Sequence, residues 1–165
     1  MASGDTLVIF SPLDNEPPSS NYATIDTRNG HPVLDFDAST DESAIFSGIL
    51  PRNYGGGGLT VTIYWMATSA TSGATRWQAA IERMDTGTDL DSDSFASAQS
   101  AGTTASATSG AQVSTAIAFT SGAQMDSLAA GEPFRLKINR DADGTTGTDD
   151  MTGDAELLAV EIKET

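Results

Sequence analysis

The chain has 165 residues, no cysteine and a formal net charge of −15, which arises from 23 acidic and 8 basic side chains. The lack of cysteine excludes disulfides, thiolate metal sites and a cysteine nucleophile. The negative field repels other polyanions, so we expect no binding to nucleic acid and none to anionic membrane surfaces. The length suits one domain with a core of its own.

Apolar side chains recur with a period of two along most of the chain, and this pattern predicts half-buried β-strands. Clusters of Gly, Pro, Asn, Asp or Ser bound each apolar run, as expected for turns between strands. In chain order the predicted strands are residues 6–10, 32–36, 43–50, 59–66, 75–83, 92–98, 113–120, 134–139 and 156–163. The run 134–139 alternates strictly between apolar and polar residues, which is typical of an antiparallel sheet with one solvated face.

The segments between these runs predict turns and very little helix. Residues 12–18 contain three prolines and resist regular structure. Residues 41–46 fit either a helical turn that starts at Asp41 or the beginning of the next strand. Residues 96–110 are rich in Ser, Thr, Ala and Gly and predict a weak strand with a loop. Residues 122–131 end at a glycine and predict one or two helical turns.

The number and spacing of these runs predict an all-β fold, a sandwich or a closed barrel, because a βαβ fold needs long helical segments between its strands. Of these we expect an antiparallel β-sandwich. No internal repeat is visible, which argues against solenoids and propellers. We expect residues 1–20 to form an N-terminal arm and the first strand, and residues 21–165 to form a single sandwich domain.

One loop carries oxygen-bearing side chains at the spacing of a calcium site. Asn139, Asp141 and Asp143 occupy positions 1, 3 and 5 of a twelve-residue segment, Gly144 follows, and Asp150 stands at position 12. However, Asp150 is shorter than the usual glutamate, and the flanking runs predict strands instead of helices. A solvated loop between two strands explains the same residues. We therefore predict no firm metal site and no cofactor, with calcium as the alternative.

The remaining candidates for chemistry do not form a recognisable catalytic set. His31 is the only histidine, and the chain contains no Gly-x-Ser-x-Gly motif. A second acidic run favours an extended loop over a cation site because its carboxylates repel one another. That run consists of Asp85, Asp89, Asp91 and Asp93. We predict that the protein is not an enzyme.

The tyrosines leave a carbohydrate-binding face open as an alternative. Aromatic rings offer apolar faces to sugars, and the chain has three tyrosines, Tyr22, Tyr54 and Tyr64. Packing in the core or in a loop is the more frequent fate of such residues.

Several stretches together are similar to a family of tailed-phage and prophage virion proteins. They are SSNYAT (19–24), RNGHPVLDF (28–36), LPRNY (50–54), LAAGEPFRL (128–136), RDAD (140–143) and GDAELL (153–158). The resemblance covers most of the chain and implies a jelly-roll sandwich without catalytic residues.

The resemblance also implies a place on the capsid surface of the virion. Members of this family act as cement or decoration proteins, so the implied partners are the major capsid protein and two further copies of the chain in a homotrimer. Such a protein stabilises the capsid lattice by adding buried area at subunit junctions. The alternative is a receptor- or glycan-binding module of a phage tail fibre or tail tip.

Overall fold

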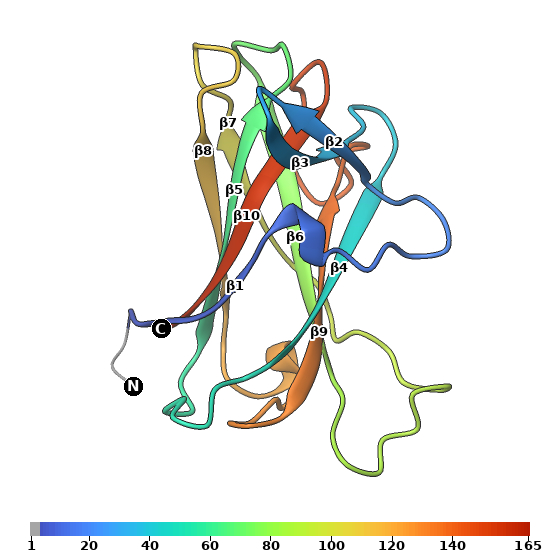
Figure 1. The fold of residues 1–165 in the computed structure, drawn as a ribbon, viewed down its shortest axis with the longest axis vertical. Coiled ribbons are helices and arrows are strands. Elements are labelled where there is room, and N and C mark those ends of the chain that lie inside the picture. Colours follow the sequence, from blue (N-terminus) through green and yellow to red (C-terminus); the bar gives the residue numbers. More distant parts are fainter. Residues whose placement is uncertain (1–3) are drawn as a thin grey trace.

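Ten strands and two short 3₁₀ turns make up residues 4–165, the part of the chain that this computed structural model describes (Figure 1). Within these residues no helix is long and apolar enough to cross a membrane. The elements are β1 (Thr6–Phe10), η1 (Pro12–Asp14), β2 (Thr24–Arg28), β3 (His31–Phe36), β4 (Glu42–Ile49), β5 (Leu59–Ala67), β6 (Ala74–Arg83), β7 (Gln99–Thr104), β8 (Val113–Phe119), η2 (Ala123–Met125), β9 (Pro133–Arg140) and β10 (Ala155–Glu164).

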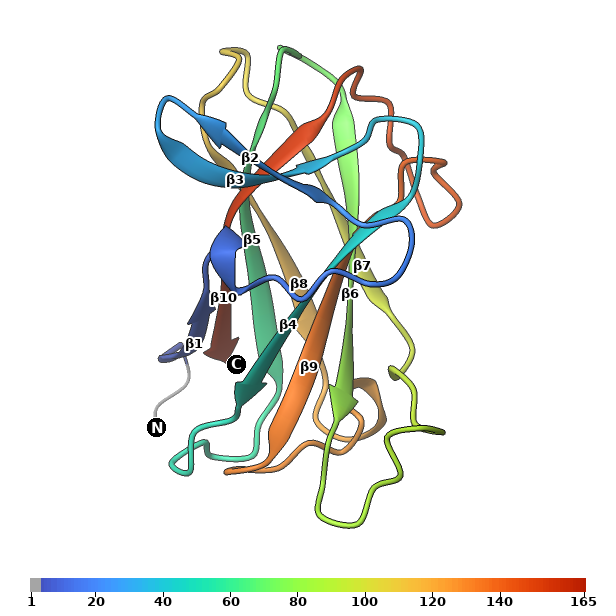
Figure 2. The same ribbon diagram turned by 45° about the vertical axis from the view of Figure 1, so that its right-hand side comes forward.

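The strands form two facing antiparallel sheets (Figures 1 and 2). Sheet A has the order β2-β3-β10-β5-β8, and β1 also pairs with β10. Sheet B has the order β4-β9-β6-β7. The predicted all-β, jelly-roll type of antiparallel sandwich is therefore confirmed.

The core lies between the sheets because each strand turns alternate side chains inward. On β9 the side chains of Phe134, Leu136 and Ile138 are completely buried, and those between them face solvent. The two tryptophans join the layers, since Trp65 on sheet A and Trp77 on sheet B lie with ring centroids 6.0 Å apart.

Two strands differ from the prediction, and both lie at sheet edges. Residues 92–98 are a loop, and the strand instead is β7, which lies within the segment predicted as weak strand and loop. The strand forms at β7 because these residues pair with β6, where Ala101 lies opposite Trp77. Strand β2 was not predicted because most of its side chains are exposed, so it lacks a buried alternating face.

The N-terminal segment from residue 4 onward belongs to the sandwich. Phe10 at the end of β1 is part of the core. The segment after η1 binds its own β4, since the Ile45 N–H donates to Asn15 Oδ1 at 3.0 Å and the Glu16 N–H donates to the Ile45 carbonyl at 2.7 Å. The predicted N-terminal arm therefore packs on this chain itself from residue 4 onward. Residues 1–3 lie outside the described residues.

A buried ion pair holds the connection between β9 and β10. The Arg140 side chain is completely buried, and its guanidinium lies 2.8 Å from the Asp149 carboxylate. It also donates to the carbonyls of Phe36, Met151 and Gly153. Together with two bonds to Asp149, these contacts engage all five guanidinium donors.

We expect Asp149→Asn to lower the free energy of unfolding by about 3–5 kcal/mol, because it leaves the Arg140 guanidinium buried without a counter-charge. Urea denaturation measures this change. Asp85→Asn is the control, since Asp85 pairs with Arg83 in a solvent-exposed position and such pairs contribute about 0–1 kcal/mol. Equal costs for the two variants would contradict the role given to the buried pair.

Candidate functional site

The outer face of sheet B carries a groove lined largely by polar side chains. The groove encloses about 210 Å³ and is lined by Asp41, Gln78, Ala79, Ala80, Ala98, Lys137 and Asn139. Its floor is formed by β6, which contributes Gln78 and two small alanines, and by β9, which contributes Lys137 and Asn139. This rigid floor fixes the polar groups in space, as a binding surface requires.

Two amide side chains lie side by side on the floor, because Asn139 of β9 is in register with Gln78 of β6. The Asn139 Oδ1 accepts a hydrogen bond from Ser43 Oγ at 3.0 Å, and Gln78 Nε2 donates to Thr146 Oγ1 at 3.2 Å. No hydrogen bond within residues 4–165 engages Asn139 Nδ2 or Gln78 Oε1. One donor and one acceptor therefore remain available to a ligand.

Lys137 adds a cationic donor to the groove. Its Nζ lies 5.1 Å from the centre of the Phe95 ring, and Arg135 lies 5.4 Å from the same ring. Arg135 is held by Glu82 at 3.0 Å, whereas in the described part of the chain Lys137 has no carboxylate within ion-pair distance. The Lys137 ammonium is fixed by the aromatic ring and keeps its hydrogen-bond donors.

The groove thus combines donors and acceptors in close succession. Lys137 and Asn139 supply donors, and Gln78 and the Asp41 carboxylate supply acceptors. A hydroxyl group needs both kinds of partner, because it donates one hydrogen bond and accepts others. The arrangement is suited to a ligand rich in hydroxyl groups.

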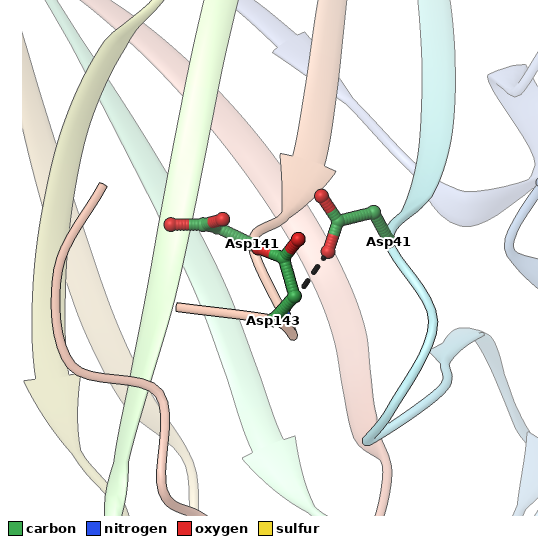
Figure 3. A group of neighbouring side chains, drawn as sticks. All are labelled: Asp41, Asp141 and Asp143. Atoms are coloured by element: carbon green, nitrogen blue, oxygen red, sulfur yellow. Dashed lines mark hydrogen bonds between the residues drawn. The ribbon is translucent and has the colours of Figure 1, made fainter. Parts of the chain in front are cut away.

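The structure brings together only part of the predicted calcium loop. Asp141 and Asp143 lie beside Asp41, with one carboxylate oxygen of each residue within 4.8 Å of the others (Figure 3). Asn139 instead lines the groove, and Asp150 Oδ1 accepts a hydrogen bond from the Ala74 N–H at 2.6 Å. Sequence reasoning missed Asp41 because it is far from the loop in the chain and reaches it only through the pairing of β4 with β9.

The buried Asp141 carboxylate organises the loop. Its Oδ1 accepts hydrogen bonds from the N–H and the hydroxyl of Thr145, and its Oδ2 accepts from the N–H and the hydroxyl of Thr146. Burial acts to raise the pKa of Asp141, but these hydrogen bonds outweigh it, so the pKa is lowered. The carboxylate holds Thr146 next to Gln78 and so shapes one wall of the groove.

We expect millimolar calcium to leave the melting temperature of EGTA-treated protein unchanged, because hydrogen bonds already engage both Asp141 oxygens. Differential scanning fluorimetry in calcium and in EGTA measures this. A rise in melting temperature with calcium that disappears in Asp143→Asn would show instead that these carboxylates bind the cation.

The three tyrosines do not gather into one platform. Tyr54 is buried, and its hydroxyl donates to the Gly57 carbonyl. Tyr64 donates to Glu161 at 2.8 Å on the outer face of sheet A. Tyr22 is 47% exposed and lies beside β4. Tyr22 alone presents a largely exposed ring.

Tyr22 forms part of a second, mostly apolar cleft between η1 and the β2–β3 hairpin. The cleft encloses about 520 Å³, within the range of small-ligand sites. Its lining residues are Pro12, Leu13, Asn15, Pro17, Tyr22, Ala23, Thr24, Ile25 and Leu34, none of which is charged.

The other predicted residues lie apart from both surfaces. His31 is exposed at the start of β3. Asp85 pairs with Arg83, and Asp89 accepts a hydrogen bond from the Asp91 N–H at 3.2 Å. The second acidic run is therefore an internally hydrogen-bonded loop.

Carboxylates crowd around Asp35 on the outer face of sheet A. Burial, together with Asp154, Glu156, Asp26 and Glu42, raises the pKa of Asp35 to about 6. Its Oδ1 is buried without a hydrogen-bond partner among the described residues. The ionised form of Asp35 is therefore unfavourable in the folded protein.

We expect Asp35→Asn to raise the melting temperature relative to the natural protein at pH 7.5 and to change it little at pH 4. The folded pKa of about 6 exceeds the ordinary 3.8, so the stabilising protonation of Asp35 is complete below about pH 4 and lost as the pH rises through about 6. Thermal melts between pH 4 and 8 measure the difference, with Asp91→Asn as control, because Asp91 is an exposed carboxylate in the β6–β7 loop and is not among the groups that raise the pKa of Asp35. A difference that is constant with pH would show that Asp35 does not titrate there.

Comparisons with known proteins identify the fold. No protein-family model and no curated protein match the chain. Among solved structures, a family 35 carbohydrate binding module from an environmental isolate is 12% identical, with 96% of this chain and 94% of that chain covered and a TM-score of 0.56.

Two further solved structures are carbohydrate-binding modules as well. The C-terminal CBM6 of LamC, a marine laminarinase from Zobellia galactanivorans, is 8% identical, with 97% and 100% of the two chains covered and a TM-score of 0.56. The module CBM6cm-2 from Cellvibrio mixtus lichenase 5A, solved with cellotriose, is 10% identical, with 98% and 99% covered and a TM-score of 0.52.

These likenesses show a shared fold. The chain has the sandwich of carbohydrate-binding modules. The predicted kinship with phage virion proteins, the capsid location and the homotrimer receive no support from these structures and stay predictions.

Proposed function

We propose that the protein is a non-catalytic glycan-binding module that holds a neutral polysaccharide in the groove of sheet B. The observation that carries the proposal is the set of groups available in the groove: Asn139 Nδ2 and Lys137 Nζ donate, Gln78 Oε1 accepts, and Asp41 accepts through the carboxylate oxygen that is not bonded to the Asp143 N–H. Vicinal hydroxyl groups of a sugar match such alternating partners. The fold shared with carbohydrate-binding modules supports this proposal.

The charge of the chain favours a neutral ligand over an acidic one. A net charge of −15 repels a polyanionic polysaccharide before contact. Among the residues that line the groove, one ammonium, that of Lys137, is present with one carboxylate, that of Asp41.

The groove is also suited to binding without hydrolysis. Glycosidases place two carboxyl groups on either side of the bond that they cleave. Among the residues that line the groove, Asp41 is the sole carboxylate; Asp141 and Asp143 cluster beside it, so no second carboxyl group lines the groove on the other side of a ligand.

This proposal corresponds to the receptor- or glycan-binding alternative set out from the sequence, while the cement role on a phage capsid remains a prediction from resemblance.

Affinity electrophoresis tests the proposal with gels that contain mixed-linkage β-glucan, laminarin, xylan or polygalacturonate. We expect retardation by at least one neutral polysaccharide and none by polygalacturonate. Asn139→Ala and Gln78→Ala should each weaken the retardation roughly fivefold, the value of one hydrogen bond.

Gln112→Ala is the matched control, because Gln112 is an exposed amide in the loop before β8 on the other sheet. It should migrate like the natural protein. Migration unaffected by every neutral polysaccharide, or equal loss in Gln112→Ala and Asn139→Ala at unchanged melting temperature, would refute binding in the groove.

A further inference from the structure

The groove floor is part of a continuous row of residues that crosses sheet B at right angles to its strands. Ser43 on β4 lies opposite Asn139 on β9, which lies opposite Gln78 on β6, which lies opposite Ser100 on β7. Residues opposite each other on neighbouring strands point to the same face. The row therefore presents four polar side chains on the outer face.

Tyr22 continues this row beyond the edge of the sheet. It forms an isolated parallel bridge with Ser43. The Ala23 N–H donates to the Ser43 carbonyl at 3.0 Å, and the Ser43 N–H donates to the Asn21 carbonyl at 2.8 Å, so backbone bonds fix the tyrosine on both sides. Because the neighbouring Ala23 is buried in the core, Tyr22 points away from it.

Two loops border the row. On one side Thr146 of the β9–β10 loop is bonded to Gln78. On the other side Phe95 of the β6–β7 loop lies against Lys137, and Ala98 lines the groove. Figure 2 shows both loops along the same side of the molecule, one above the other. The groove therefore lies between these two loops.

We propose, on the basis of the glycan-binding function above, that the ligand is a linear chain of several sugar units that extends from the groove to Tyr22, which stacks on its outermost unit. Neighbouring strands are ~4.8 Å apart, so the distance from Gln78 to Tyr22 is roughly 14 Å. One sugar ring does not cover this span. The ring of Tyr22 and the uncharged cleft beside it offer the apolar contact that a sugar face needs.

Isothermal titration calorimetry tests this with linear oligosaccharides of two, four and six units prepared from the neutral polysaccharide that the natural protein retains. We expect the affinity to rise with length up to the unit that reaches Tyr22. Tyr22→Ala should weaken binding of the six-unit chain roughly fivefold or more and leave the two-unit chain unchanged. Tyr22→Phe, which keeps the ring, should bind all lengths like the natural protein.

Tyr64→Ala is the control for loss of a tyrosine, since Tyr64 lies on sheet A. Affinity that does not depend on length, or an equal loss for all lengths in Tyr22→Ala, overturns the extended site while leaving groove binding intact. If no oligosaccharide of any length binds, the glycan-binding function itself fails and this inference with it. The two failures are therefore distinguishable.

Discussion

The buried guanidinium of Arg140 is the contact on which the arrangement of the groove depends. Removing a charged group from water is costly, and here five hydrogen bonds and the Asp149 carboxylate offset that cost. Asp149 also accepts a hydrogen bond from the Arg76 N–H at 2.9 Å. The β9–β10 loop is thus tied to both central strands of sheet B and to the end of β3.

The anchored β9–β10 loop forms a wall on the outer face of sheet B. With both ends of the loop fixed, the Asp141 carboxylate gathers Thr145 and Thr146 around itself, and Thr146 reaches Gln78. The acidic residues that suggest a calcium loop in the sequence serve here as hydrogen-bond acceptors that order a wall. Loops on a rigid scaffold are the usual carriers of binding, and this one follows that rule.

The surplus of negative charge is distributed unevenly over the two sheets. On sheet A it crowds around Asp35, where Arg28 offsets only part of it through its 2.6 Å contact with Glu156. On sheet B cationic residues alternate along β9, and Lys137 is held by an aromatic ring instead of a carboxylate. The protein as a whole repels acidic ligands, yet its groove presents balanced partners to a neutral one.

The sequence by itself determined the all-β fold class, because a period of two in apolar residues gives each strand one face to bury, and packed sheets bury such faces. It identified the strands that carry a buried face, such as β5 and β9, but it missed β2 and indicated β7 only as a weak strand within residues 96–110, because neither has a buried alternating face. It also pointed to Tyr22 and to the loop after Asn139, without indicating how they relate. Only the tertiary structure decided that, because strand register places Tyr22, Ser43, Asn139 and Gln78 in one row although they lie far apart along the chain. Register follows from the packing of all strands together, and no local stretch of residues contains it.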